Sequence, residues 1–145
     1  MKLSARSRYA TRLLLDLAIN ADNAPLKAPL LSEHTGITVQ FIEQIMKPLK
    51  RAGLVTSQRG ANGGHTLAKN PETITLADIV DIMEEGIQLT KCCADPAACD
   101  RSDECKARDA WLHASNALRE GLAAISLADL MHSPISSHSL LSEEE

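Results

Sequence analysis

Two short helical patterns joined by one glycine constrain the fold of this chain more than any other feature. Residues 29–35 read as a helix that ends at Gly36, which suits a left-handed C-terminal cap. Thr38 can then cap a second helix over residues 39–52, which Gly53 ends. Two helices with a tight glycine turn are typical of a helix-turn-helix, although many helical hairpins share the pattern. The expected buried face of the second helix consists of Phe41, Ile42, Ile45 and Leu49.

A β-hairpin is expected directly after the second helix. Residues 54–58 and 65–68 read as short strands, and the glycine-rich segment 59–64 lies between them. A hairpin in this place is interpreted as a wing, whose glycines let the backbone approach another surface closely. Arg59 at its base suits insertion into a narrow minor groove of DNA. A nucleotide-binding loop is disfavoured because the Gly-Lys-Ser/Thr ending of that motif is missing.

The net charge of −4 conceals a strong asymmetry between the two halves of the chain. Residues 1–70 hold ten Lys/Arg and four Asp/Glu, a balance of +6, whereas residues 71–145 hold five and fifteen, a balance of −10. A basic half is typical of a surface that binds a polyanion. An ordinary solvated charge distribution is the alternative interpretation.

Two further helices are expected after the hairpin. Thr75 and Asp78 form a capping box for a helix over residues 76–85. A longer helix is expected over about residues 103–125, where an apolar seam repeats at spacings of three and four. The seam suits a coiled-coil partner helix, and the alternative is packing against the same chain's first helix, residues 7–20. The seam consists of Trp111, Ala114, Leu118, Leu122 and Ile125.

The cysteines of this chain are clustered within fourteen positions. They are Cys92, Cys93, Cys99 and Cys105. Thiolates are soft ligands for zinc, copper(I) or iron–sulfur clusters and are also the reactive groups of redox switches. The six-residue steps Cys93-x5-Cys99-x5-Cys105 fit poorly with the close thiol pairs of structural zinc and with the C-x2-C run of ferredoxins. An iron–sulfur cluster is the favoured interpretation, and a cluster-free thiol switch and zinc are the alternatives.

The sequence indicates neither a membrane span nor secretion. No apolar run approaches the ~20 residues that span a membrane, and the N-terminus leads directly into a charged amphipathic pattern. Free cysteines in such a chain fit a reducing cytoplasm. The five histidines, at positions 34, 65, 113, 132 and 138, are dispersed, and no acid–base pair adjoins a motif. We therefore expect a cytoplasmic protein that is not an enzyme.

Five motifs along residues 1–125 recur together in one known family. They are Leu3-Ser-Ala-Arg-Ser-Arg-Tyr-Ala10, Phe41-Ile-Glu-Gln44, Ala52-Gly-Leu-Val55, Arg59-Gly-x-x-Gly-Gly64 and the Cys-x5-Cys-x5-Cys run. With these motifs the chain resembles the Rrf-two family of bacterial winged helix-turn-helix transcription regulators, which includes iron–sulfur and nitric-oxide sensors. The resemblance implies a homodimer joined by the long C-terminal helix. Each subunit would present one helix to the major groove and one wing to the minor groove of double-stranded DNA.

The resemblance also implies which side chains contact DNA. Gln44 can pair bidentately with adenine, and Glu43 can accept from cytosine. Two alternatives stay open, namely that Glu43 only repels wrong sequences and that Phe41 only fills the core. His65 stands where the family commonly has Tyr, and we interpret it as structural rather than as a ligand. The implied DNA-contacting residues are Thr38, Gln40, Phe41, Glu43, Gln44 and Arg59. The expected phosphate contacts, which position without specifying, are Lys47, Lys50 and Arg8.

For the cysteine run, the resemblance implies a [2Fe–2S] or [4Fe–4S] cluster ligated by Cys93, Cys99 and Cys105. The family completes the ligand set with a His after the third Cys or with an acid near the N-terminus of the partner chain. Here those two positions hold Arg108 and Arg8, and arginine cannot ligate a metal. The remaining candidates for the fourth ligand are Cys92, which is favoured, Asp109, Asp103 or an exogenous small thiol.

The predicted architecture is therefore mainly α-helical with a small β-wing, a winged helix-turn-helix followed by a long C-terminal dimerisation helix. The predicted function is a DNA-binding transcription repressor whose operator affinity is controlled by an iron–sulfur cluster or by the redox state of its cysteines. The alternatives are a cluster-free thiol-switch regulator and an iron–sulfur scaffold or electron carrier that does not bind DNA. The expected parts are a DNA-binding domain, 1–86; a cysteine-containing cluster loop, 87–106; a dimerisation helix, 103–127; and a disordered tail, 128–145.

Overall fold

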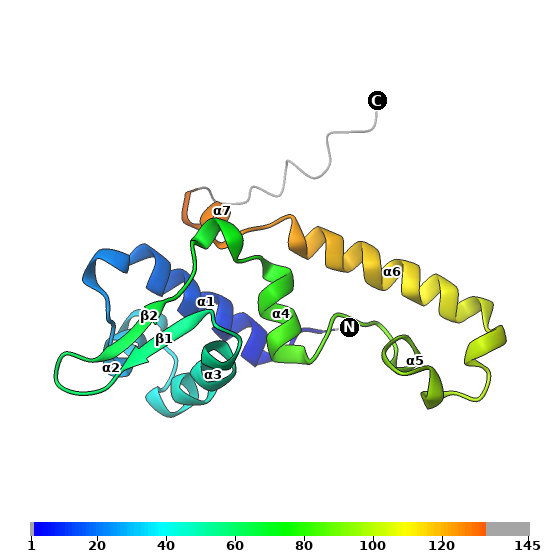
Figure 1. Cartoon of the computed structure of the whole chain (residues 1–145), viewed down its shortest axis with the longest axis horizontal. Coiled ribbons are helices and arrows are strands. Elements are labelled where there is room, and N and C mark those ends of the chain that lie inside the picture. The colour runs from blue at the N-terminus through cyan, green and yellow to red at the C-terminus, as the bar shows by residue number, and fades with distance from the viewer. Residues whose placement is uncertain (1, 133–145) are drawn as a thin grey trace.

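Helices dominate the computed structural model, which describes residues 2–132 (Figure 1). The elements are α1 (Ala5–Ile19), α2 (Ala28–Thr35), α3 (Val39–Arg51), β1 (Val55–Gln58), β2 (Gly64–Leu67), α4 (Leu76–Glu84), α5 (Lys91–Ala94), α6 (Lys106–Ala123) and α7 (Leu127–His132). The predicted fold class, mainly α with a small β-wing, is confirmed because β1 and β2 pair antiparallel directly after α2 and α3.

An aliphatic core surrounds α1, which packs against α2, α3, α4, α7 and β2. Leu13 and Leu14 of α1 and Ile45 and Leu49 of α3 are fully excluded from solvent. Burial of a side chain of this size stabilises a fold by about 1.5–3 kcal/mol. Aromatic rings lie at the edge of this core, since Tyr9 and Phe41 are only partly buried against it and Trp111 is 49% exposed. The fold therefore depends on close packing of aliphatic side chains.

The helix-turn-helix prediction is confirmed at α2 and α3, with bounds that differ from the expected ones by one residue. Gly36 ends α2 with a φ of 74°, and the Thr38 hydroxyl accepts a hydrogen bond from the Phe41 N–H at 3.3 Å. Arg12 of α1 donates to the carbonyl oxygen of Thr35 at 3.0 Å, which satisfies an acceptor at the end of α2. The turn is thus held by its own caps and by α1.

The wing strands are fastened to the body by a contact that the sequence did not predict. In the ladder Val55 pairs with Leu67 and Ser57 pairs with His65. Leu26, just before α2, bridges to the outer side of β2: its N–H donates to the His65 carbonyl at 2.9 Å, and the His65 N–H donates back at 2.8 Å. β2 therefore lies between β1 and Leu26, and this bridge fastens the wing to the body.

A polar cluster joins the end of α4 to the start of α1. The Glu84 carboxylate accepts hydrogen bonds from the backbone N–H and the hydroxyl of Ser4 and from the hydroxyl of Ser7. Ser4 is also the N-cap of α1. The hydrogen bond from Ser7, followed by that from Ser4, holds the pKa of Glu84 below its ordinary value of 4.5. We call this set the Glu84 cluster.

The segment that carries the cysteines is not the irregular loop that the sequence predicted. It forms α5 and two single helical turns, Pro96–Ala98 and Ser102–Glu104. Asp95 and Pro96 explain the first of these turns. The Asp95 side chain accepts a hydrogen bond from the Ala97 N–H at 2.9 Å, and the ring of Pro96 fixes its own backbone φ at a value that suits a helical turn. Cys105 is the N-cap of α6, so the long helix begins three residues later than expected and ends at Ala123.

The apolar seam of α6 packs on α4, and not on α1 as one of the two interpretations required. Leu118 and Leu122 contact a small cluster formed by Ala77, Val80 and Ile87. An ion pair between Arg119 and Asp81 lies beside this contact. Trp111, at the other end of the seam, stays half-exposed, so the seam is only partly covered by its own chain.

The predicted disordered tail begins too early. Residues 128–132 belong to α7, whose Leu127 is buried and whose Leu130 and Met131 pack against the core. Ser126 and Asp129 cap this helix reciprocally: the Ser126 N–H donates to the Asp129 carboxylate at 2.8 Å, and the Asp129 N–H donates to the Ser126 hydroxyl oxygen at 3.1 Å. That spacing is a visible sequence signal for a helix start. Residues 133–145, the rest of the predicted tail, lie outside the described residues.

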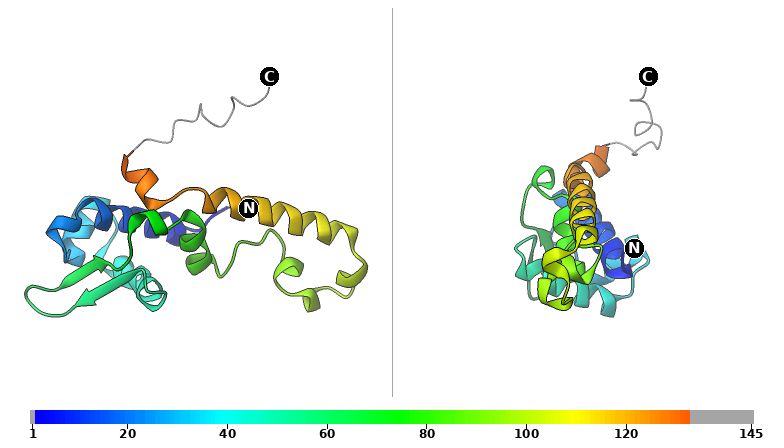
Figure 2. Two further views of the ribbon diagram at one scale, coloured as in Figure 1. Left: turned by 45° about the horizontal axis from the view of Figure 1, so that its top comes forward. Right: turned by 90° about the vertical axis from the view of Figure 1, so that its right-hand side faces the viewer.

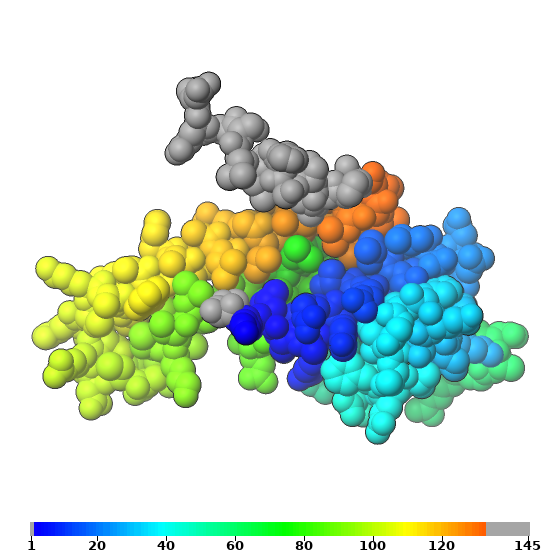
Figure 3. Space-filling model, turned by 180° about the vertical axis from the view of Figure 1, so that it is seen from behind, coloured from blue at the N-terminus to red at the C-terminus, as the bar shows by residue number. Residues whose placement is uncertain are grey.

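The wing and the cysteine segment lie at opposite ends of the elongated molecule (Figures 1 and 2). The view from behind shows α6, in yellow and orange, running along one side and reaching beyond the core body (Figure 3). The helix α4 lies between the two ends, because it packs against both α1 and α6.

We predict that Glu84→Gln lowers the free energy of unfolding at pH 7 by about 1–2 kcal/mol, since three donors lose a charged acceptor. Because folding lowers the Glu84 pKa, this contribution is complete above the ordinary value of 4.5 and is lost as pH falls through the lowered value. Denaturant unfolding of both proteins from pH 7 to pH 3 measures the difference. The exposed neighbour Glu85 provides the control Glu85→Gln, and an equal effect of the two variants would contradict the prediction.

Candidate nucleic-acid interface and cysteine segment

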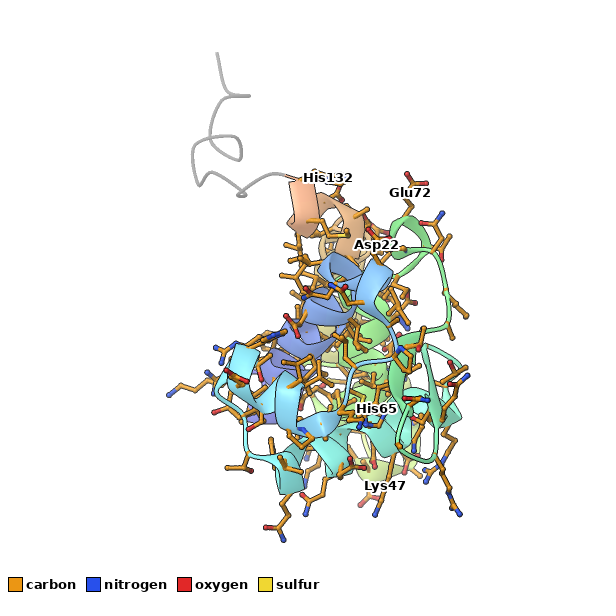
Figure 4. All side chains as sticks on the ribbon, turned by 90° about the vertical axis from the view of Figure 1, so that its left-hand side faces the viewer. Asp22, Lys47, His65, Glu72 and His132 are labelled. Atoms are coloured by element: carbon orange, nitrogen blue, oxygen red, sulfur yellow. The ribbon has the colours of Figure 1, made fainter. Side chains whose placement is uncertain are left out.

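The outer face of α3 presents a row of exposed polar side chains. The row consists of Thr38, Gln40, Glu43, Gln44, Lys47 and Lys50. They share one face because helix residues three and four apart are neighbours. Figure 4 shows Lys47 at the outer edge of the body. The helix presents amide, carboxylate and ammonium groups together, which are the groups that hydrogen-bond base edges and phosphates.

Phe41 does not belong to this polar row. Its ring packs edge-on against Tyr9 of α1, with centroids 5.6 Å apart and an interplanar angle of 89°. Met46 takes the fourth buried position that the sequence assigned to Phe41, which is only half-buried. The guanidinium groups of Arg8 and Arg12 lie 5.8 and 5.6 Å from the Tyr9 ring. These contacts hold two positive charges next to the start of α3.

A groove separates α3 from the wing. Three cations line it from different elements: Lys27 before α2, Lys50 on α3 and Arg59 on the wing. Lys27 was missed by the sequence reading, because it is an isolated residue in a loop and only the tertiary fold brings it here. Glu43 and His65 line the same groove. A groove of this charge suits a nucleic-acid backbone that follows α3 and the wing.

Two adjacent glycines are sterically required where the wing loop ends and β2 begins. A Cβ on Gly64 would lie 2.6 Å from the carbonyl carbon and oxygen of Leu26, and its φ is 146°. A Cβ on Gly63 would lie 2.2 Å from the carbonyl oxygen of Gln58. Gly60 at the tip has a φ of 101° but has open space around it. The glycine-rich pattern therefore serves close backbone packing.

The four thiols lie in different environments. Cys93 is buried, Cys92 and Cys105 are half-buried, and Cys99 is exposed. The Thr90 hydroxyl lies 3.1 Å from the sulfur of Cys92 and 3.1 Å from that of Cys93. This hydroxyl brings two of the predicted ligands close to one polar group. The thiol of Cys105 lies with Asp103 at a shallow hollow on the surface.

As arranged here, the predicted ligands do not surround a common point. Within residues 2–132, no group of three or more Cys, His, Asp or Glu side chains is placed to hold a metal ion. The donor chemistry suits a soft metal, but the arrangement does not fit a cluster without movement of the segment. Arg108 has a different partner, since its Nε donates to the Cys92 carbonyl oxygen at 2.9 Å. Arg8 lies on α1 and outside the segment altogether.

Over residues 2–132, no helix is long and apolar enough to cross a bilayer.

Comparison with known proteins gives consistent relatives. The family model Rrf2, described as an iron-dependent transcriptional regulator, matches residues 3–133. Protein rrf2 of Nitratidesulfovibrio vulgaris is 37% identical over 90% of this chain and 87% of its own length. The HTH-type transcriptional regulator IscR of Aliivibrio salmonicida is 34% identical over 90% of this chain and 77% of its own length. The solved structure of CymR, the global cysteine regulator of B. subtilis, has a TM-score of 0.72 and 29% identity, covering 90% of this chain and 96% of that one.

We predict that Gly64→Ala destabilises the protein by about 1–3 kcal/mol, because the added methyl group meets the Leu26 backbone in a conformation that L-residues rarely adopt. Gly60→Ala is the matched control, with a positive φ but no clash. Denaturant unfolding should show the smaller loss for the control. Equal losses would mean that backbone conformation alone, and not the contact with Leu26, requires glycine at this position.

Proposed function

This chain belongs to the Rrf2 family of transcriptional regulators, and we propose that it represses transcription by binding operator DNA through α3 and the wing. Members of this family regulate transcription and are not enzymes. The observation that carries the proposal is the exposed polar face of α3 beside a groove with three cations. Such a surface matches a major groove and the phosphates that flank it.

The proposal assigns different roles to the side chains of this surface. Gln44 and Gln40, which are exposed on α3, would read base edges, and Glu43 would accept from a cytosine amino group. Arg59, in the loop that joins β1 to β2, would enter the minor groove. Thr38 caps α3 and lies at its exposed start, where a phosphate contact is favourable. Phe41 supports the start of α3 through Tyr9 instead of reading a base. The phosphate contacts are Lys47, Lys50, Arg8 and Lys27.

A homodimer through α6 would give the two half-sites that such regulators read. The half-exposed Trp111 supports this proposal, because the seam of α6 continues beyond the part that packs on α4. Burial of Trp111 against the same helix of a second subunit would complete the seam. Because such a dimer would act on chromosomal DNA, we propose a bacterial cytoplasmic location.

We further propose that the cysteine segment controls operator affinity. The relative IscR and the iron-dependent description of the family favour an iron–sulfur cluster, with Cys93, Cys99 and Cys105 as ligands and Cys92 as the candidate for the fourth. A cluster, when bound, would supply sensitivity to iron, oxygen or nitric oxide. The structural relative CymR and the pair of sulfurs beside Thr90 favour a cluster-free thiol switch as the second candidate.

We predict that Lys47→Ala weakens binding evenly across DNA sequences and reduces the salt slope of the affinity by about 1, because one phosphate contact is lost. Gln44→Ala should instead lose about 1–3 kcal/mol of discrimination at one base pair and keep the salt slope. Titrations at several salt concentrations measure both effects. Lys106→Ala, at the start of α6, is the control with the same charge change. If no variant changed the affinity, or if binding were independent of salt, the scaffold or electron-carrier interpretation would be favoured.

We predict that anaerobically purified protein contains iron and sulfide, and that its operator affinity differs roughly tenfold from that of air-exposed protein. The variant with Cys93, Cys99 and Cys105 all changed to Ala should lack iron and show one affinity in both conditions. Absorbance, an iron and sulfide count and operator titration give the answer. A redox response without iron would identify the thiol switch, and Cys92→Ala then tests the pair beside Thr90. If the triple variant kept the difference in operator affinity between anaerobic and air-exposed protein, the cysteine segment would not be the sensor.

A further inference from the structure

His65 links the wing to the outer face of α3. Its Nε2 lies 3.5 Å from a carboxylate oxygen of Glu43, and its Nδ1 lies 2.6 Å from the hydroxyl oxygen of Ser57. The side chain of His65 is 7% exposed and that of Glu43 is 51% exposed. A buried ring therefore meets a solvent-facing carboxylate at the edge of the groove between α3 and the wing, and Figure 4 shows His65 inside the body at this place.

The position of the imidazole is set by the sheet and not by Glu43. The backbone of His65 is held by two hydrogen bonds to Leu26 and by its pairing with Ser57 across the ladder. Gly64, directly before it, packs against the Leu26 backbone. Glu43, in contrast, stands on an exposed helix face, where a glutamate side chain keeps most of its rotamer freedom. Of the two partners, the histidine is the fixed one.

The hydrogens of this contact follow from what each group can offer. A carboxylate only accepts, so the Nε2 atom that faces Glu43 must carry the hydrogen. The Ser57 hydroxyl then donates to Nδ1 of a neutral ring, or accepts from Nδ1 of a charged one. In either state the N–H of Nε2 points toward Glu43, and 3.5 Å makes this an electrostatic contact longer than an ordinary hydrogen bond.

The groove offers Glu43 other partners. Lys27, Lys50 and Arg59 line it with Glu43, and each could attract the carboxylate. A Glu43 side chain that turned toward one of these cations would leave its place on the face of α3 and neutralise a charge that suits a phosphate. The contact with His65 opposes that movement.

We propose that His65 is a positioning residue for base readout: it holds the Glu43 carboxylate in one orientation on α3 and so sets which base that carboxylate accepts. The inference rests on the proposed function, because it requires that α3 enters a DNA groove. It extends that function, because the wing then contributes to sequence choice through the contact of His65 with Glu43 in the same chain, in addition to its own contact with DNA.

The test begins with the full-length protein and a pool of random-sequence DNA duplexes, from which the wild-type protein selects a preferred site. The base pair read by Glu43 is then the position at which Glu43→Gln relaxes the preference. His65→Phe keeps a ring of similar size but removes both nitrogen contacts, whereas His65→Gln keeps an N–H near the place of Nε2. His34→Phe is the control, since His34 contacts Asp16 of α1 and does not line the groove between α3 and the wing.

We expect His65→Phe to lose roughly tenfold discrimination at that single base pair, with unchanged affinity for non-specific duplex, which reports an intact wing and helix. His65→Gln should restore most of the discrimination. His65→Phe combined with Glu43→Gln should lose no more than Glu43→Gln alone, because the two residues act as one unit. The control should behave as the wild type.

Three results would overturn the inference: wild-type discrimination in His65→Phe, additive losses in the double variant, or equal losses in His65→Phe and His65→Gln. Loss of non-specific affinity in His65→Phe together with full function in Glu43→Gln would also overturn it, because His65 would then only support the fold. If the wild-type protein selected no preferred sequence from the pool, the first step of the test would fail, and this result would overturn the operator proposal itself.

Discussion

The burial of one face of α1 is the constraint on which the rest of this structure depends. Leu13 and Leu14 are fully excluded from solvent, and α2, α3, α4, α7 and β2 all pack around the helix that carries them. Because the helix-turn-helix and the wing both rest on α1, this packing sets the place of the outer face of α3 relative to the groove. Polar contacts then fasten α2 and the wing to this core. Arg12 fastens the end of α2, and the Leu26 backbone fastens the wing.

A continuous series of packed elements connects the two ends of the molecule. α4 packs its apolar face on Leu118 and Leu122 of α6, and its last residue joins the start of α1 through the Glu84 cluster. The packed elements between the cysteine segment and α3 are therefore α6, α4 and α1. The ion pair of Asp81 with Arg119 lies on this route.

Two side chains that the sequence singled out make polar contacts that their spacing did not reveal. Arg108 stands where a ligand was expected, and it donates to the backbone of Cys92 instead. His65, which was expected to be structural, joins Ser57 to Glu43. One contact lies in the cysteine segment and the other joins the wing to α3.

The sequence alone determined the local features of this protein. Gly36 and Thr38 mark the turn between α2 and α3, Thr75 starts α4, and the glycine-rich segment 59–64 marks the wing, because capping and turn chemistry act between residues close in the chain. Helical periodicity marked most of the buried face of α3, and Ser126 with Asp129 could have located α7. Only the tertiary structure decided the contacts between distant residues. Leu26 with His65, Ser4 with Glu84 and the meeting of Lys27 with Arg59 carry no signal in sequence spacing, since they arise from how the helices pack around α1. The arrangement of the cysteines belongs to this second group, because six-residue steps do not specify a direction for any thiol until the segment between α4 and α6 has folded.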